Sequence, residues 1–270
     1  MSYSENSTQS VSGFPGKIND DAYHGIAGEI IKTIEPHTES DPVGLLLQFL
    51  VSAGNAIGPS PYYRVEMTRH KPNLFLVIVG ETSKARKGTG YDWIDRIVTM
   101  ADDGWKNCHA SGMSSGEGII YHVRDQSDDD EGDIDRRLMV FEGEFASALK
   151  SSARERNTLS PVLRNAWDGK VLRTLTKNSP IISTGAHVSI IGHITTYELK
   201  HLLCQSDMSN GFGNRFLWAC VRRARLLPFG GSIEESDLVP LANRLRGFMM
   251  EASKGGVVTM DDLARQYWIK

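Results

Sequence analysis

One basic stretch of the sequence has residue types that suit phosphate chemistry. GETSKARKGT (residues 80–89) lies between a continuously apolar run and a stretch with helical periodicity. In that setting backbone N–H groups and a helix N-terminus face an anion, a lysine neutralises the outer phosphates and a hydroxyl binds Mg²⁺. We therefore predict that phosphates are bound by residues of this loop: Gly80, Thr82, Lys84, Arg86, Lys87, Gly88 and Thr89.

The spacing of this loop departs from the standard pattern GxxxxGK[ST]. Ala85 stands where the second glycine is expected, and Gly88 separates Lys87 from Thr89. If Lys87 is the phosphate lysine, the loop is one residue longer than the standard one, and Thr89 supplies the hydroxyl for Mg²⁺. The alternative is a basic surface turn that only joins a strand to a helix.

A pair of acidic residues follows another apolar run, LMVF at residues 138–141. Glu142 comes directly after it and is predicted at the carboxyl edge of a sheet, where ligands bind in open α/β folds. There it would hold Mg²⁺ through water or polarise an attacking water. Glu144 is the alternative base; otherwise it only starts the next helix, where negative charge suits the helix dipole.

Three further side chains are catalytic candidates because of their positions. Glu117 opens a helix as a carboxylate near a γ-phosphate, although Ser114 and Glu117 also have the spacing of a capping box. His193 ends the buried run SIIGHIT, where it would either sense a γ-phosphate or cap the following helix. Arg215, in the glycine-rich NGFGNRF, is a candidate arginine finger acting across a subunit interface, or an exposed arginine without that role.

Strand and helix patterns alternate along the chain, which is typical of an α/β fold with a mainly parallel central sheet flanked by helices. Short apolar runs predict the strands, and periodic or capped segments predict the helices. Strands are expected at residues 62–67, 74–79, 138–141, 188–191 and 216–221. Helices are expected at residues 24–37, 42–56, 89–101, 116–124, 145–152, 158–167 and 196–204. Residues 171–184 predict a β-hairpin inserted before the strand at 188.

The same patterns divide the chain into four segments. Residues 1–20 are rich in Ser, Asn and Gly and predict a flexible leader. Residues 21–61 predict an N-terminal helical segment, and residues 62–250 the α/β domain. Residues 251–270 are expected to start a further segment, and the helical pattern that runs uncapped to its end indicates a shortened sequence.

Composition restricts the classes of protein that fit. The 270 residues are 40% hydrophobic and 23% charged, as in soluble globular proteins. A net charge of −3 argues against a wholly basic nucleic-acid coat but leaves room for local basic patches. Three widely spaced cysteines form neither a disulfide scaffold nor a zinc-binding pattern. No signal peptide or membrane-spanning run is visible, so we expect a cytoplasmic protein without a membrane partner.

Six motifs occur in an order that resembles a known family. They are GETSKARKGT after LFLVIV, SGMSSGEGII, MVFEGEFASALK, LSPVLRNAWDGKVLRTLTKNSP, SIIGHIT and NGFGNRFLW. In this order they resemble a bacterial domain-of-unknown-function family of primase–helicase-like replication proteins from plasmids, prophages and mobile elements. That family is similar to RecA-like P-loop ATPases of the hexameric helicase kind. The resemblance covers about residues 22–250.

The resemblance implies a RecA-like fold with an ATP site that uses Mg²⁺. Lys87 and Thr89 would lie at the phosphates, Glu142 would be the strand-end acid and Arg215 the finger. A glutamate at position 142, where an aspartate is usual, and the irregular loop depart from the family's pattern.

The resemblance also implies partners. A homo-oligomeric ring would grip single-stranded DNA and work with a primase or another replication protein. The inserted hairpin, with Arg173, Lys177 and Asn178, would lie where such rings contact DNA.

Three functions follow from these observations. The first is an ATP-driven motor on DNA. The second is a nucleotide-binding module that loads or regulates replication proteins without turnover. The third is a carboxylate–metal nuclease, which requires Asp168 to lie beside Glu142 and Glu144.

Overall fold

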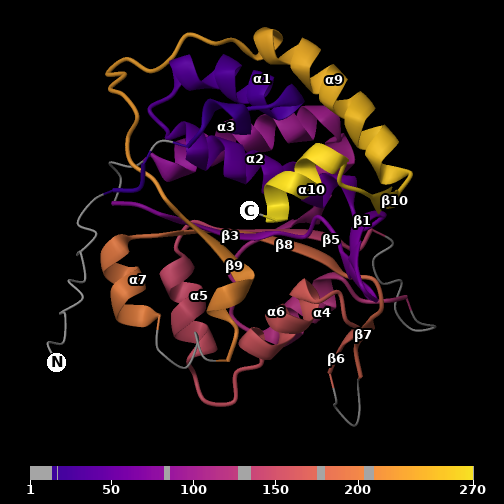
Figure 1. Cartoon of the computed structure of the whole chain (residues 1–270). Coiled ribbons are helices and arrows are strands. Elements are labelled where there is room, and N and C mark those ends of the chain that lie inside the picture. Colours follow the sequence, from indigo (N-terminus) through magenta and orange to yellow (C-terminus); the bar gives the residue numbers. More distant parts are fainter. Residues whose placement is uncertain are drawn as a thin grey trace, which may run out of the picture.

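The chain folds around a central sheet of five parallel strands (Figure 1). The computed structural model describes residues 14–16, 18–81, 86–126, 135–174, 180–203 and 210–269. Across the sheet the strand order is β4 (His109–Ala110), β5 (Arg137–Glu142), β8 (His187–Ile194), β3 (Phe75–Val79) and β9 (Phe216–Cys220). Every neighbouring pair in this sheet is parallel, so the prediction of a mainly parallel α/β fold is confirmed.

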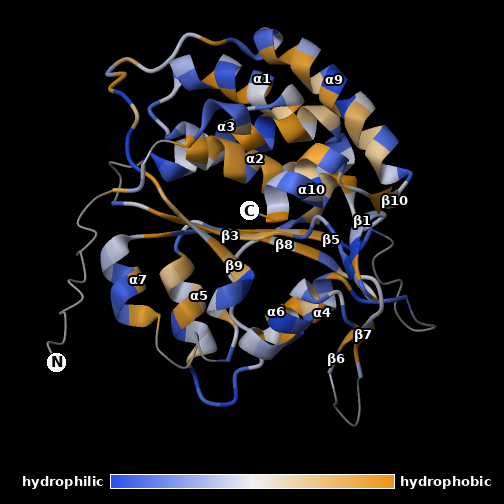
Figure 2. Cartoon of the chain, viewed as in Figure 1, coloured by the Kyte–Doolittle hydropathy of each residue, from blue (hydrophilic) through white to orange (hydrophobic). Residues whose placement is uncertain are grey.

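Helices cover both faces of this sheet (Figure 1). On one face lie α1 (Gly25–Ile34), α2 (Pro42–Ile57), α3 (Lys87–Ala101) and α9 (Glu235–Ser253). On the other lie α4 (Gly116–His122), α5 (Phe145–Ser152), α6 (Leu159–Trp167) and α7 (Thr196–Leu202). Figure 2 shows apolar residues concentrated along the strands between the two layers. All residues of β3 and β8 are buried, as continuous apolar runs predict for strands covered on both faces.

The two faces of β3 contribute to two separate apolar cores. Leu76 and Ile78 join the core under α1, α2, α3 and α9. Phe75, Val77 and Val79 join the core over α4, α5 and α6. This alternation follows from the pleat of a strand, which points successive side chains to opposite faces.

The N-terminal helices form as the sequence predicts. The α2 helix begins at Pro42, and the Asp41 side chain accepts a hydrogen bond from the Val43 N–H, which satisfies one of the free donors of the first turn. In α1, Ile30, Ile31 and Ile34 are fully buried. Both helices pack in the same core as α3 and α9, so they cover one face of the central sheet.

Two small sheets lie outside the central one. Residues Pro61–Val65 (β1) pair antiparallel with Thr68–His70 (β2) and parallel with Gly256–Val258 (β10). The predicted hairpin is present as two short antiparallel strands, Leu172–Arg173 (β6) and Ile182–Ser183 (β7). Lys177 and Asn178 lie outside the described residues. Short 3₁₀ segments and a last helix, α10, complete the described elements: Asp20–Ala22, Glu35–His37, Asp103–Cys108, Gly213–Arg215 and Asp262–Ile269 (α10).

None of the helices in the described part of the chain is both long and apolar enough to span a bilayer.

Candidate functional site

The topology of the sheet marks one crevice at the carboxyl ends of the strands. After β3 the chain enters α3 on one face, whereas after the neighbouring β8 it enters α7 on the other face (Figure 1). Two adjacent strands whose connections leave to opposite faces form a topological switch point, and open α/β sheets bind ligands there. Gly80 and Glu81 after β3, and Lys87 at the start of α3, border this crevice.

Lys87 is the predicted site residue that the structure places most clearly at the switch point. It is the first residue of α3, and its Nζ donates to the carbonyl oxygens of Gly80 (3.0 Å) and Glu81 (3.1 Å). Burial lowers the pKa of the Lys87 ammonium, and the Glu198 carboxylate partly opposes that shift. The result is a half-buried cation held at the end of β3, with only backbone carbonyls as hydrogen-bond partners among the described residues.

The N-terminus of α3 lies beside this cation, and no side chain among the described residues caps it. The two helices that follow β4 and β8 are capped, by Ser115 and Thr195 respectively. The first N–H groups of a helix have no partner within the helix, and they carry the positive end of the helix dipole. An uncapped helix start next to a lysine can bind an anion such as a phosphate group.

The structure gives different outcomes for the other residues predicted in this loop. Gly80 is buried at the end of β3, where its N–H donates to the carbonyl oxygen of Ile194 (3.1 Å). A Cβ at Gly88 would meet nothing within 4 Å, so the space around it does not require glycine. Thr82 and Lys84 lie outside the described residues.

Thr89 and Lys87 are directed to different sides of α3. Residues two positions apart on a helix point about 200° apart. Thr89 accordingly lines a cavity of about 300 Å³ together with Glu39, Arg86 and Trp93, away from the carbonyls that hold Lys87. The structure thus does not bring the hydroxyl assigned to Mg²⁺ next to the Lys87 ammonium, and its metal role stays a prediction.

Glu142 lies on the same edge of the sheet as Lys87. It is the last residue of β5 rather than the residue after it, and 7% of its surface is exposed. One carboxylate oxygen, Oε1, accepts the Met113 N–H (2.5 Å), which attaches the β4–α4 connection to this edge. The other, Oε2, has no hydrogen-bond partner among the residues that the structure describes. A carboxylate held by one oxygen keeps the second for a water or a hydrated cation.

Glu144 and Glu117 are exposed at the first turns of helices on the other face. Glu144 is the N-cap residue of α5, and its carboxylate accepts no cap hydrogen bond; its place at the start of a helix fits the simpler interpretation. Glu117 accepts the Thr158 hydroxyl (2.8 Å) and so joins α4 to the start of α6. The predicted capping box of Ser114 and Glu117 is wrong, because α4 starts one residue later and Ser115 accepts the Gly118 N–H.

His193 is buried inside β8 and does not cap the following helix. Its Nε2 is 3.0 Å from the Gln48 Oε1 of α2, and its ring packs edge-on against Phe141. Burial, together with the nearby Lys87 charge, lowers the pKa of His193 to about 3. The cap of α7 is Thr195, which forms a full capping box with Glu198. A γ-phosphate-sensing role for His193 stays a prediction, with a neutral imidazole as its starting state.

Arg215 and Asp168 lie at the opposite edge of the sheet. Arg215 immediately precedes β9, so it is at the amino ends of the strands, and its guanidinium contacts both Asp168 oxygens (3.1 and 3.2 Å). Asp168 therefore does not lie beside Glu142 and Glu144, which contradicts the arrangement that the nuclease hypothesis requires. Within one chain Arg215 is also far from Lys87 along the strands, and its role as an arginine finger stays a prediction.

The hairpin is at the amino edge as well. Its first strand follows α6 and its second leads into the amino end of β8. Arg173 is exposed there, at the end of β6. Arg173, which is predicted to contact DNA, and Lys87, which is predicted to contact phosphates, thus lie at opposite edges of the sheet.

The sequence patterns did not identify two residues of the α1–α2 connection that contact Arg86, one of the predicted site residues. Glu39 Oε2 accepts the Arg86 Nε–H (2.6 Å), and the Ser40 hydroxyl donates to the Arg86 carbonyl oxygen (2.9 Å). Both contacts span more than 45 residues of sequence. No local pattern signals such a pair, since neither residue lies in a periodic segment.

Two larger cavities flank the sheet edges. One of about 710 Å³ at the carboxyl edge is lined by the ends of β3 and β9 and by Phe14, whose ring lies 4.7 Å below the Arg222 guanidinium. It is also lined by Gly80 and Glu81, whose carbonyl oxygens accept from the Lys87 ammonium.

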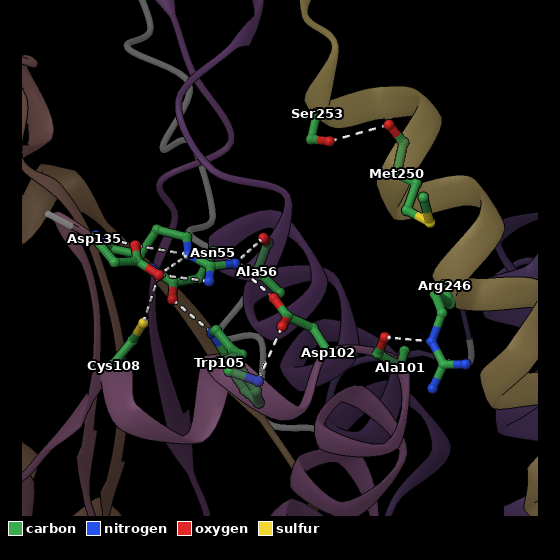
Figure 3. Close-up of polar contacts among 12 residues, drawn as sticks. Asn55, Ala56, Ala101, Asp102, Trp105, Cys108, Asp135, Arg246, Met250 and Ser253 are labelled. Carbon is green, nitrogen blue, oxygen red and sulfur yellow. Dashed lines mark hydrogen bonds and ion pairs between the residues drawn. The ribbon is translucent and has the colours of Figure 1, made fainter.

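The second cavity, of about 880 Å³, is at the amino edge between the ends of α2, α3 and α9. Its charged groups are already paired: Arg137 contacts Asp135 and Asp102 and also the Ala56 carbonyl oxygen. Figure 3 shows Asp135, Asp102 and Ala56 close together. Nearby, Arg246 donates a hydrogen bond to the Ala101 carbonyl oxygen. This cavity is lined by a structural ion-pair network and holds none of the predicted site residues.

No group of three or more His, Cys, Asp or Glu side chains within the described ranges is placed to hold a metal ion. A scan against protein-family models finds no match for this sequence, and a search of the curated proteins finds none either.

Proposed function

We propose that this chain binds Mg·ATP at the switch-point crevice and hydrolyses it in a RecA-like domain. The observation that carries this proposal is the Lys87 ammonium, held at the end of β3 beside the uncapped start of α3. A cation and free helix N–H groups facing one crevice favour a polyphosphate over other ligands. The parallel sheet and the acid at the end of β5 support a RecA-like fold.

Each residue has a defined part in this mechanism. Lys87 neutralises the β- and γ-phosphates, and the N–H groups at the start of α3 hydrogen-bond their oxygens. The free Oε2 of Glu142 orients the attacking water or a water of the Mg²⁺ shell. Two strand spacings, about 10 Å, separate β5 from β3, which leaves room for the phosphates and a water between the acid and the lysine. Mg²⁺, when bound with the nucleotide, neutralises charge on the phosphates.

The coupling to DNA and the assembly are parts of the same proposal. We infer a ring in which Arg215 of each subunit approaches the nucleotide of its neighbour, because its position at the amino edge precludes a role in its own crevice. The hairpin that carries Arg173 contacts single-stranded DNA through the phosphate backbone, which makes DNA binding salt-sensitive. A protein of this kind would serve the replication of a mobile element together with a primase or another replication partner.

The alternative is a nucleotide-binding module that regulates replication proteins without turnover. One observation favours it: Thr89 lines a different cavity from the one that Lys87 faces, so the usual hydroxyl for Mg²⁺ is not in place. This module would bind Mg·ATP through Lys87 but would not hydrolyse it.

The test is Mg·ATP hydrolysis by the purified chain with and without single-stranded DNA. Lys87→Ala removes the phosphate cation, and we expect turnover to fall at least 100-fold. Lys254→Ala is the matched control, because Lys254 is an exposed lysine at the far end of α9 that pairs only with Glu251 among the described residues. Turnover that Lys87→Ala leaves unchanged would contradict the proposal. Nucleotide binding that depends on Lys87, without turnover, would favour the regulatory module.

A further inference from the structure

The connection between α1 and α2 holds Arg86, the N-cap residue of α3, through two contacts. The buried Ser40 hydroxyl donates to the Arg86 carbonyl oxygen (2.9 Å), and Glu39 accepts the Arg86 Nε–H (2.6 Å). Thr38 orients Ser40, since its Oγ1 accepts the Ser40 N–H (3.2 Å). One contact fixes the backbone of Arg86 and the other fixes its side chain.

This grip matters because Arg86 has a strained backbone. Its φ of 49° and ψ of 33° are in the left-handed region, which residues other than glycine rarely adopt. The Arg86 carbonyl oxygen also accepts the Gly90 N–H (3.2 Å), the first bond of α3. The direction in which α3 leaves the loop thus depends on keeping this conformation.

Ser40 also packs against the first turn of α3. A Cβ built at Gly90 would lie 2.9 Å from the Ser40 Oγ and 3.1 Å from its Cβ. Glycine at position 90 therefore permits the close approach that lets the Ser40 hydroxyl reach the Arg86 carbonyl oxygen.

Glu39 connects a third segment to the same point. Its Oε1 accepts the Leu227 N–H (2.9 Å) in the β9–α9 connection, and the Arg223 guanidinium lies 3.7 Å from its Oε2. The Leu227 N–H, followed by the Arg86 guanidinium, holds the pKa of Glu39 below its usual value. The carboxylate is thus charged at neutral pH and stays a partner for Arg86.

We propose that Glu39 and Ser40 are positioning residues for nucleotide binding: they hold Arg86 in its left-handed conformation, so that Lys87 and the free N–H groups of α3 face the crevice. This inference rests on the proposed function, because it assigns these two residues to the same site. It makes the N-terminal helical segment part of the nucleotide site, although neither residue touches the phosphates.

The test is a double-mutant cycle on the dissociation constant of Mg·ATP. Ser40→Ala removes the bond to the Arg86 carbonyl oxygen, and we expect binding to weaken about five- to tenfold. Arg86→Gly removes the need for that bond, because glycine adopts the left-handed conformation without strain. In the Arg86→Gly background, Ser40→Ala should therefore change the dissociation constant less than twofold.

Ser253→Ala serves as the matched control, since its hydroxyl bonds the Met250 carbonyl oxygen at the far end of α9. It should leave the dissociation constant unchanged. An equal loss from Ser40→Ala in both backgrounds would overturn the inference, because it would mean that Ser40 acts only through general stability.

Amide hydrogen exchange without nucleotide separates this inference from the proposed function. Ser40→Ala should accelerate exchange in the peptide that spans residues 86–92, and should not do so in the Arg86→Gly background. Unchanged exchange in Ser40→Ala would overturn the positioning role. If the unaltered chain binds no Mg·ATP, the proposed function fails, and the role of Ser40 in nucleotide binding fails with it. Accelerated exchange in Ser40→Ala would in that case still show that Ser40 orders residues 86–92.

Discussion

Glu142 combines a structural contact and a free acidic oxygen in one buried side chain. Its Oε1 holds the Met113 N–H, whereas Oε2 has no partner among the described residues. The hydrogen bond from Met113 fixes the rotamer of Glu142, and this rotamer also sets the position of Oε2. The position was predictable from the sequence, because an acid that follows four apolar residues lies at a strand end. The contact to Met113 was not, because it joins two different strand ends.

At this residue the charge and the hydrogen bond can be separated. Glu142→Gln keeps an oxygen for the Met113 N–H but loses the negative charge, so we expect turnover to fall at least 100-fold with the free energy of unfolding nearly unchanged. Glu142→Ala also leaves the buried N–H unpaired, which costs about 1–3 kcal/mol of stability. The measurements are the turnover number and urea unfolding. Full turnover in Glu142→Gln would exclude Glu142 from the chemistry.

The α2 helix is attached to β8 by polar contacts as well as by apolar packing. His187 Nε2 lies 3.1 Å from the Gly54 carbonyl oxygen, and His193 Nε2 lies 3.0 Å from Gln48 Oε1. Between them Asn55 donates to the His187 carbonyl oxygen (3.2 Å). Since both histidines are buried, each contact forms with a neutral ring.

The burial of these two histidines makes stability depend on pH. Burial lowers the pKa of His187 to about 4 and that of His193 to about 3. In the unfolded chain both titrate near 6.5. The unfolded state therefore binds more protons between about pH 6.5 and 4, so stability is greatest above 6.5 and falls on acidification, by up to about 1.4 kcal/mol per pH unit for each histidine.

Urea unfolding from pH 7.5 to 4.5 measures this slope. His187→Gln retains a donor for the Gly54 carbonyl oxygen without a titrating ring, so we expect it to lose part of the decline. The rest comes from His193 and from His109, whose pKa burial also lowers. Asp and Glu residues with lowered pKa act at lower pH and do not account for this window. A variant with the parent's slope would show that His187 is not the group responsible.

The sequence predicts long or fully buried elements better than short or exposed ones. The strands at β3, β5, β8 and β9 follow from apolar runs, and α2 from its Asp41 cap. In contrast, β2 and β10 have three residues each and are exposed, so neither burial nor alternation marks them. They form because the chain at β1 offers an edge for pairing, which depends on the tertiary structure.

At the scale of the whole molecule, the carboxyl and amino edges of the sheet carry different sets of predicted site residues. The carboxyl edge gathers Lys87 at the start of α3, which follows β3, with Glu142 of β5 and His193 of β8. These three strands are far apart in sequence and adjacent in the sheet. The amino edge gathers the hairpin and the ion pair of Arg215 with Asp168. The sequence could predict each of these residues separately. Which of them lie at the same edge of the sheet depends on the strand order and direction.

The N-terminal helices also have a place that the sequence does not reveal. They were predictable as helices, but their packing with α3 and α9 in one core is a tertiary result. Through Glu39 and Ser40 this layer contacts Arg86, which precedes α3. A sequence pattern cannot report that contact, since it depends on how α2 is placed across the sheet.

The central claim is that the crevice at Lys87 binds nucleotide phosphates, and equilibrium titration tests it most directly. The dissociation constants of Mg·ATP, Mg·ADP and AMP would be measured for the parent chain, Lys87→Ala and the control Lys254→Ala. We predict that Lys87→Ala weakens Mg·ATP binding about 10- to 100-fold, as expected for the loss of a charge-assisted contact. We also predict that AMP binds much more weakly than ATP to the parent, and that the control matches it. Equal affinity in Lys87→Ala and the parent, or equal affinity for AMP and ATP, would contradict the claim.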